Sequence, residues 1–352
     1  MSDNLVYIAN AGDADYGITV AELDYDNATL NIVQRVTEIG ECHYLNPHPN
    51  GRFLVATTMD GGVQVVSFAI DSDGTLSLVS SRPAAGTSPA YVCVDDSESN
   101  VLMVNYVVGE ARGNIRVYPI DEEGRLGAAT EHIEREGSGP NPDRQEVSHP
   151  HMIVTTPDNR FAVVPDLGTD MVYLYALDAE RGKLNLAQSL DLPPGAGPRH
   201  VAFHPHLNRM YVINELDSTM ATFACDDGDN WTRLSVLSTL PAGYVQPRLR
   251  PNTCADAHVH PNGRFLYGSN RGHDSIVIYA LDADGLPNLL GHEATRGAWP
   301  RAFMIDKRGE LLVVGNRHTD SAALFAIDAD SGMLAYRSSV AMSAPIAFKM
   351  ID

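Results

Sequence analysis

The chain has 352 residues, of which 44% are hydrophobic and 20% charged, the balance of a folded chain with a substantial apolar core. Its formal net charge of −20 at pH 7 gives an acidic surface that repels the phosphate backbone of nucleic acids. No apolar run approaches the roughly 18 to 20 residues of a membrane span, and no basic stretch leads into an apolar one at the N-terminus, so we expect a cytoplasmic protein that binds neither nucleic acid nor membrane.

A turn followed by a strand recurs along the chain. Turns rich in Pro, Asx and Gly, such as HPNGRF and TPDNRF, lead into apolar or alternating runs that end on a polar residue. This pattern is typical of a tight turn and a β-strand. In chain order the copies occupy residues 1–10 (which lack the turn), 48–58, 96–106, 156–166, 204–214, 260–270 and 306–316.

A second strand-like run, closing on an acidic residue, follows each copy. These runs are residues 18–24, 63–71, 114–121, 171–178, 219–227, 275–282 and 321–328. A short turn and a weaker third run come next, and another apolar stretch precedes most of the turns. Four short strands in each unit, at a spacing of roughly 46 to 60 residues, are typical of a β-propeller blade.

Seven such units predict an all-β, seven-bladed β-propeller that forms a single domain over residues 1–352. The N-terminal unit lacks its first strand. The last residues, APIAFKMID (344–352), resemble WPRAFMID (299–306), which precedes the final turn. We therefore expect the C-terminal segment to pair with the N-terminal segment in one blade and to close the ring, which hides the sheet edges.

Residues that recur in the repeat are predicted to be structural. His48, His204 and His260 each directly precede a turn proline, so we expect them to stabilise the turns. The cysteines are far apart and form no CxxC pair, which favours reduced, buried thiols over a disulfide framework or a zinc site. They are Cys42, Cys93, Cys225 and Cys254.

The register of the repeat brings a different set of residues to one mouth of the central channel. Consecutive strands of a blade are antiparallel, so the start of the first strand and the end of the second lie on the same face. Six residues before the turn proline, or before its replacements Ser97 and Lys307, stand His43, Tyr91, His151, Arg199, Ala255, Arg301 and Ile346. At the ends of the second strands stand Asn214, Glu215, Asn270, Arg271 and Arg317, among others. The long segments 131–148 and 241–253 are predicted to wall this mouth.

Four stretches resemble the lactonase-type seven-bladed β-propeller family. They are HPHMIVTTPDNRFAVVPDLGTD, GPRHVAFHPHLNRMYVINELDS, ADAHVHPNGRFLYGSNRGHDSI and PRAFMIDKRGELLVVGNR. The resemblance extends over essentially the whole chain, and the family includes the propeller-type 6-phosphogluconolactonases and the carboxy-cis,cis-muconate lactonizing enzymes. It implies a catalytic set without a metal, which falls on His151, Arg199, Glu215 and Arg271. It also adds His258, through its ADAH motif, whereas His149 has no settled role and is interpreted as a loop neighbour.

These residue types suit the hydrolysis of a lactone. Arginine binds an oxyanion, a carboxylate or a phosphate with a planar fork, as expected for Arg199 and Arg271. Glu215 is assigned as the base toward water and His151 as the acid, although the reverse division is equally defensible. We expect no metal and no cofactor, because the arginines repel a divalent cation. The expected substrate-binding residues are His43, Tyr91, His258, Arg301, Asn214 and Asn270.

The sequence thus predicts a metal-independent lactonase for a small anionic sugar lactone, 6-phosphoglucono-δ-lactone first, which it would hydrolyse to 6-phosphogluconate. Arg248, Arg250 and Arg301 are candidates for holding the phosphate. Two alternatives stay open. One is a lactonase or cycloisomerase for another lactone or a muconate, and the other is a propeller that binds a partner without catalysis.

Overall fold

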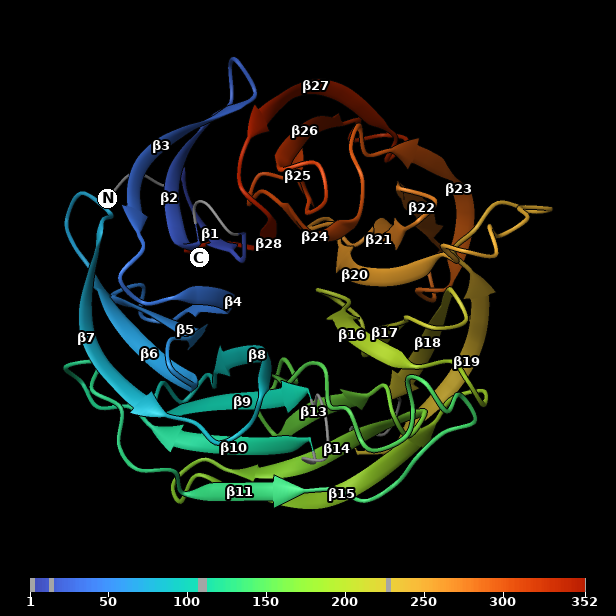
Figure 1. The fold of residues 1–352 in the computed structure, drawn as a ribbon. Coiled ribbons are helices and arrows are strands. Elements are labelled where there is room, and N and C mark those ends of the chain that lie inside the picture. Colours follow the sequence, from blue (N-terminus) through green and yellow to red (C-terminus); the bar gives the residue numbers. More distant parts are fainter. Residues whose placement is uncertain (1–3, 13–15, 107–112, 226–228, 352) are drawn as a thin grey trace.

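The structure is a computed structural model that describes residues 4–12, 16–106, 113–225 and 229–351. In these residues 28 strands form seven four-stranded antiparallel sheets, and no helix is present. Figure 1 shows the sheets arranged in a ring around a common axis. The predicted all-β, seven-bladed propeller is confirmed. The predicted runs 1–10, 219–227 and 344–352 reach into residues 1–3, 226–227 and 352, which lie outside the described ranges.

The strands of each blade follow one another from the axis outward. Blade 1 contains β28 (Pro345–Met350), β1 (Leu5–Asn10), β2 (Gly17–Asp24) and β3 (Thr29–Val36); blade 2 contains β4 (Glu41–Pro47), β5 (Phe53–Met59), β6 (Val63–Ile70) and β7 (Leu76–Pro83); blade 3 contains β8 (Ser88–Val94), β9 (Asn100–Tyr106), β10 (Asn114–Pro119) and β11 (Glu131–Glu134). Blade 4 contains β12 (Val154–Thr155), β13 (Phe161–Asp166), β14 (Met171–Asp178) and β15 (Lys183–Asp191); blade 5 contains β16 (Pro198–Phe203), β17 (Arg209–Asn214), β18 (Thr219–Cys225) and β19 (Trp231–Ser238). Blade 6 contains β20 (Thr253–Val259), β21 (Phe265–Arg271), β22 (Ser275–Leu281) and β23 (Pro287–Ala294); blade 7 contains β24 (Pro300–Ile305), β25 (Leu311–Asn316), β26 (Ser321–Ile327) and β27 (Leu334–Ala341).

The two ends of the chain close the ring as predicted. Strand β28 pairs antiparallel with β1, and Val6 lies opposite Met350 and Ile8 opposite Phe348. The C-terminal segment therefore supplies the innermost strand of blade 1. The segment 131–148, which was predicted to wall the mouth of the channel, is only partly a loop. Its first four residues form β11, the outer strand of blade 3, and residues 135–148 are the loop.

The core lies between the faces of neighbouring blades, which explains the continuous apolar runs of the middle strands. All six residues of β13 are buried, whereas β15 at the rim of the same blade is mostly exposed. Buried tyrosines join the blades, since Tyr211 donates a hydrogen bond to the carbonyl of Gly285 at 2.7 Å in the next blade. The four cysteines are buried and free, as predicted.

The three turn histidines hold successive blades together. The Nε2 atoms of His48, His204 and His260 lie 2.9–3.0 Å from backbone carbonyls of the next blade's turn, at Glu98, Gly263 and Gly309 respectively. In each case Nδ1 accepts a backbone N–H of the histidine's own turn. Their predicted structural role is confirmed.

His260→Ala should lower the free energy of unfolding by about 1–3 kcal/mol, because Gly309 loses a hydrogen bond at a buried site. Urea unfolding measures the change. The matched control is His206→Ala, an exposed histidine of the neighbouring turn, for which we expect a change within about 0.5 kcal/mol. Equal effects of the two substitutions would contradict the proposed bridge between blades.

Candidate active site

Bulges in the innermost strands set the direction of several predicted site residues. His43, Arg199 and Arg301 each lie unpaired at a register shift between the first and second strands of their blades. A bulge inserts one residue into a strand and re-aims its side chain. In these three blades the position six residues before the turn proline, or before its replacement Lys307, is therefore a bulge position, which the repeat register located.

In blade 3 the predicted register is wrong by one residue. The bulged residue there is Ala90, and Asp95 occupies the place that His48 holds in blade 2. A shift of one residue moves a side chain to the other face of a strand. Tyr91 accordingly lies away from the pocket and stacks on Tyr44, with ring centroids 3.8 Å apart.

A pocket of about 310 Å³ opens at the predicted mouth. Four arginines line it against a single carboxylate, so it is strongly cationic in a protein whose net charge is −20. Its lining residues are His43, Ser88, Pro89, Ala90, Tyr106, Arg144, His151, Glu215, Arg271, Trp299, Arg301 and Arg317.

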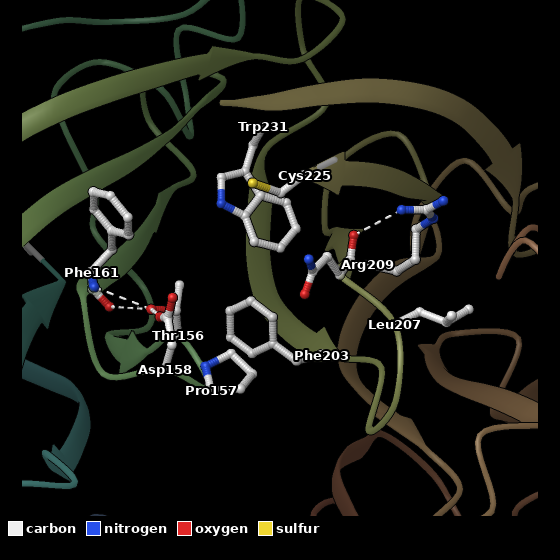
Figure 2. A pocket seen from close by; sticks show the side chains of 10 residues that line it. Thr156, Pro157, Asp158, Phe161, Phe203, Leu207, Arg209, Cys225 and Trp231 are labelled. Atoms are coloured by element: carbon white, nitrogen blue, oxygen red, sulfur yellow. Dashed lines mark hydrogen bonds between the residues drawn. The ribbon is translucent and has the colours of Figure 1, made fainter. Parts of the chain in front are cut away.

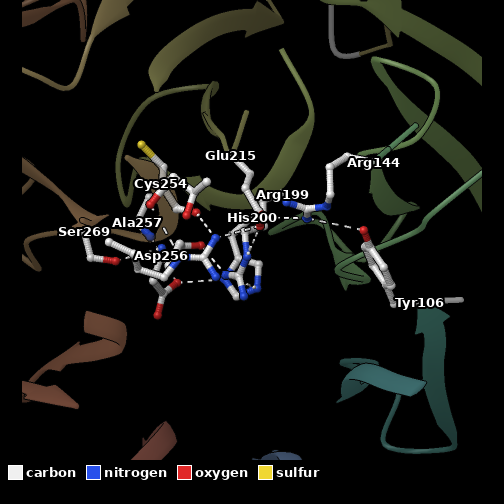
Figure 3. A network of polar contacts seen from close by, with 12 residues as sticks. Tyr106, Arg144, Arg199, His200, Glu215, Cys254, Asp256, Ala257 and Ser269 are labelled. Carbon is white, nitrogen blue, oxygen red and sulfur yellow. Dashed lines mark hydrogen bonds and ion pairs between the residues drawn. The ribbon is translucent and has the colours of Figure 1, made fainter. Parts of the chain in front are cut away.

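Glu215 is the centre of the charge network (Figure 3). Its Oε1 accepts a hydrogen bond from Nη2 of Arg144 at 2.6 Å. Its Oε2 lies 2.8 Å from Nη2 of Arg271 and 2.9 Å from Nε of Arg199, as ion pairs. The backbone fixes two of these cations further, because Arg271 donates to the carbonyl of Cys254 at 2.6 Å and Arg199 to that of Ala255.

This arrangement determines the charge of Glu215. Burial alone would raise the pKa of its carboxyl group, but Arg271, Arg199 and Arg144 hold that pKa far below its ordinary value. Burial and the neighbouring Arg271 lower the pKa of Arg199 to about 10, which leaves the guanidinium charged at neutral pH. Glu215 is therefore an ionised carboxylate with very little affinity for a proton.

His151 is the neutral partner in the pocket. It is 6% exposed, and its Nδ1 has no hydrogen-bond partner among the described residues. Burial, and next the charge of Arg199, hold the pKa of its imidazole well below the ordinary value. The adjacent His149 is buried and stacks on Tyr106 with centroids 4.4 Å apart, so it is a packing residue of the loop.

Two buried residues below the pocket were missed by the sequence reasoning. His200 Nδ1 lies 2.8 Å from Asp256 Oδ1, and His200 Nε2 lies 3.2 Å from Nη1 of Arg199. Burial, and then Arg199, lower the pKa of His200 to about 4 in spite of Asp256. His200 follows a bulge and Asp256 lies within one, so their side-chain directions could not be read from strand alternation.

His258 does not lie with the predicted substrate-binding residues. Its Nε2 is 3.2 Å from Asp256 Oδ2, and it lines a different hollow at the opposite mouth, among the Pro-Asn-Gly turns with Pro49 and Pro261. His258 lies only three residues before Pro261, so it is too far along its strand to reach the mouth that holds the arginine-rich pocket.

Asn214 and Asn270 also differ from the prediction, because their side chains are buried in the blades. Asn214 donates to Thr219 at 2.8 Å, and Asn270 donates to the carbonyl of Thr239 at 2.9 Å. Asn316, at the equivalent place in blade 7, donates to the carbonyl of Thr295 at 2.8 Å. Recurrence at the strand end reflects the anchoring of blade connections, and neither predicted residue lines the pocket.

Arg144 is the contribution of the predicted wall 131–148. Gln145 anchors this loop through hydrogen bonds to Leu167 and Asp170 at 2.8 and 2.7 Å. The other predicted wall, residues 241–253, contributes none of the residues that line the pocket. Its Arg250 lies over the ring of Trp299 and 3.0 Å from Nδ1 of His318. The length of the first loop was the only signal for a site residue there, since the repeat has no equivalent position.

A separate hollow on blades 4 and 5 is mainly apolar (Figure 2). Phe161, Phe203 and Trp231 line it, and Arg209 is turned toward the backbone of Asn208 at 3.0 Å. It lacks the convergent histidines and arginines of the first pocket. Across the described residues, no group of three or more His, Cys, Asp or Glu side chains is placed to hold a metal ion.

The fold and the site thus define a seven-bladed propeller with an arginine-rich pocket at one mouth. The family model "Lactonase, 7-bladed beta-propeller" matches residues 6–350. The chain is 32% identical over 341 residues to the 6-phosphogluconolactonase of Bacillus subtilis (strain 168), covering 95% of this chain and 94% of that protein. It belongs to the family of seven-bladed β-propeller lactonases.

Two solved structures agree over nearly full length. A protein from Lactobacillus plantarum is 30% identical with a TM-score of 0.90, and 99% of each chain is covered. The periplasmic gluconolactonase of Pseudomonas aeruginosa is 25% identical, also with a TM-score of 0.90 and 99% of each chain covered. Among the described residues there is no helix with the length and apolar character needed to cross a membrane.

The partly buried His43 and the buried His200 predict a free energy of unfolding that falls in mild acid. Burial lowers the pKa of His43 to about 4, as it does for His200, whereas an unfolded chain binds these protons near pH 6.5. The stability that these two neutral histidines contribute to the folded protein is therefore fully present above about pH 6.5 and is lost as the pH falls toward 4. His43→Gln should reduce the slope of unfolding free energy against pH by up to about 1 kcal/mol per pH unit in that interval.

Urea unfolding at several pH values between 7.5 and 4.5 tests this expectation. The control is His132→Gln, which removes an exposed histidine of β11 and should leave the slope as in the wild type. A slope that is insensitive to His43→Gln would show that this histidine is protonated equally in both states.

Proposed function

We propose that the protein is a metal-independent lactone hydrolase whose substrate is 6-phosphoglucono-δ-lactone and whose product is 6-phosphogluconate. The observation that carries the proposal is a neutral, buried imidazole, His151, in a pocket lined by four arginines and one carboxylate. Such a pocket favours an anionic substrate and supplies both a base and stabilisation of an oxyanion. The name of the Bacillus subtilis relative supports the same substrate.

The order of proton affinities favours His151 as the base. Glu215 is held by three arginines and is a very weak base, whereas His151 is neutral and lines the same pocket. His151 takes a proton from water as the water oxygen bonds to the lactone carbonyl carbon. The same proton then passes to the ring oxygen as the ring C–O bond breaks. In this scheme His151 serves as both base and acid, and Glu215, which the sequence analysis assigned as the base, takes part in neither proton transfer.

The arginines near Glu215 stabilise the negative charge that develops on the carbonyl oxygen. Arg271 and Arg144 both line the pocket, and Glu215 holds each of them at 2.8 Å or less. A guanidinium fixed beforehand needs little reorganisation when the charge appears, which is the condition for effective electrostatic catalysis. Glu215 and the buried Arg199 are then positioning residues.

His151→Gln should lower kcat for 6-phosphogluconolactone by about 100- to 10,000-fold, because it removes the base while keeping a similar volume. The measurement is lactone hydrolysis by purified protein in EDTA, at pH 6 to 8, after subtraction of spontaneous hydrolysis. Wild-type activity should be unchanged by EDTA. It should also stay level down to pH 6, since the pKa of His151 lies well below its ordinary value.

The control is His206→Gln, on an exposed turn away from the pocket. Unphosphorylated gluconolactone is assayed in parallel, because a relative in structure carries the name gluconolactonase. Turnover of neither lactone by a folded wild-type protein would refute the proposed substrate. Activity that EDTA abolishes and a divalent cation restores would refute metal independence.

A further inference from the structure

We propose that Arg301 and Arg317, together with His43, form a subsite of the pocket that binds the phosphate of the substrate. The inference rests on the proposed function for the identity of the whole ligand. The chemical class that the subsite accepts, a phosphate dianion, follows from its own residues and can be tested without turnover.

The arginines at this mouth of the channel differ in their pairing. Arg144, Arg199 and Arg271 are each paired with Glu215. Arg301 and Arg317 line the same pocket and are partly buried, yet neither guanidinium makes a hydrogen bond or ion pair with any described side chain or carbonyl. An unpaired charge that has lost part of its water is costly, so a bound anion would stabilise it.

The two unpaired arginines come from adjacent strands of blade 7 and line one pocket. Pro300 on β24 pairs directly with Asn316 on β25, and Arg301 and Arg317 immediately follow these two residues. The bulge at Arg301 leaves it outside the strand pairing. Two planar forks that line one pocket offer several N–H donors to the oxygens of one phosphate, which a single lysine could not match.

The electrostatic surroundings of His43 favour the same ligand. Burial lowers the pKa of His43 to about 4, and the charges of Arg301 and Arg317 act in the same direction. His43 and both arginines line the same pocket, and the carboxylate of Glu41 lies 3.4 Å from Nε2 of His43. A dianion bound between them would oppose that effect, so His43 could then accept a proton and donate a hydrogen bond to it.

The position of the subsite suits a ligand that reacts at its other end. Arg301 and Arg317 lie in blade 7 and His43 in blade 2, whereas His151 and Glu215 lie at blades 4 and 5, on the opposite side of the axis. Trp299 lines the same pocket, and its ring centroid lies 5.2 Å from the guanidinium carbon of Arg271. A sugar between the two sides would hold its lactone carbonyl near His151 and its phosphate near Arg301.

Steady-state kinetics with two lactones separate this role from general damage. Arg301→Met and Arg317→Met should each lower kcat/KM for 6-phosphogluconolactone by about 10- to 100-fold, the worth of a charge-assisted hydrogen bond. The value for unphosphorylated gluconolactone should change by less than about 3-fold. Arg301→Lys keeps the charge and should recover part of the loss. Equal losses for both lactones would overturn the proposal.

The matched control is Arg337→Met, which removes an exposed arginine from the outer strand of the same blade. It should leave both kinetic constants as in the wild type. A selective loss with Arg248→Met or Arg250→Met, and none with Arg301→Met, would place the phosphate on the loop 241–253 instead and would overturn the proposal.

Titration calorimetry with inorganic phosphate tests the subsite even if the wild type hydrolyses neither lactone. The wild type should bind inorganic phosphate at low ionic strength, and the double variant Arg301→Met, Arg317→Met should bind it at least about 10-fold more weakly. Phosphate binding that is the same in both proteins would overturn the subsite. A wild-type protein that binds phosphate through these arginines but hydrolyses neither lactone would overturn only the proposed hydrolysis.

Discussion

The carboxylate of Glu215 is the constraint on which the site depends. Three guanidinium groups within 2.9 Å of its two oxygens could not lie together without it, because like charges in a buried site repel strongly. Burying these charges costs free energy that the pairing offsets only in part, so the cluster is not retained for stability alone. What it provides is a set of cations held in fixed positions around one mouth of the channel.

The propeller fold makes this cluster possible because it brings distant segments to one place. Arg199 and Glu215 belong to blade 5, Arg271 to blade 6, and Arg144 to the loop before blade 4. Arg199, Glu215 and Arg271 come from strand ends or bulges, whereas Arg144 comes from a loop that Gln145 anchors by hydrogen bonds. Ring closure by β28 and β1 then fixes the diameter of the channel and hence the spacing of all seven inner strands. A small shift of one blade would separate charges that are useful only together.

The repeat predicted the fold well because every blade obeys the same local pattern of turn, strand and acidic end. It predicted the mouth residues for the same reason, and a position six residues before the turn proline proved to be a bulge in several blades. It failed at Tyr91, where the turn lacks its proline and the alignment slipped by one residue. The strand-end asparagines Asn214 and Asn270 were misread because a recurrent polar residue is more often structural. Arg144, His200 and Asp256 were beyond the method, since a loop and two bulged segments have no fixed side-chain direction.

The charge of the whole protein and the charge of the pocket act over different distances. A net charge of −20 repels an anionic substrate in solution, but salt at physiological concentration screens that repulsion within about 8 Å. Inside the pocket the low dielectric preserves the field of four arginines against one carboxylate. The pairing with Glu215 divides this field into two parts. The paired arginines are already compensated and gain most from a charge that appears only during reaction, whereas the unpaired Arg301 and Arg317 gain from an anion present from the start. In the proposed subsite an anionic ligand would therefore be oriented by charge before any bond changes.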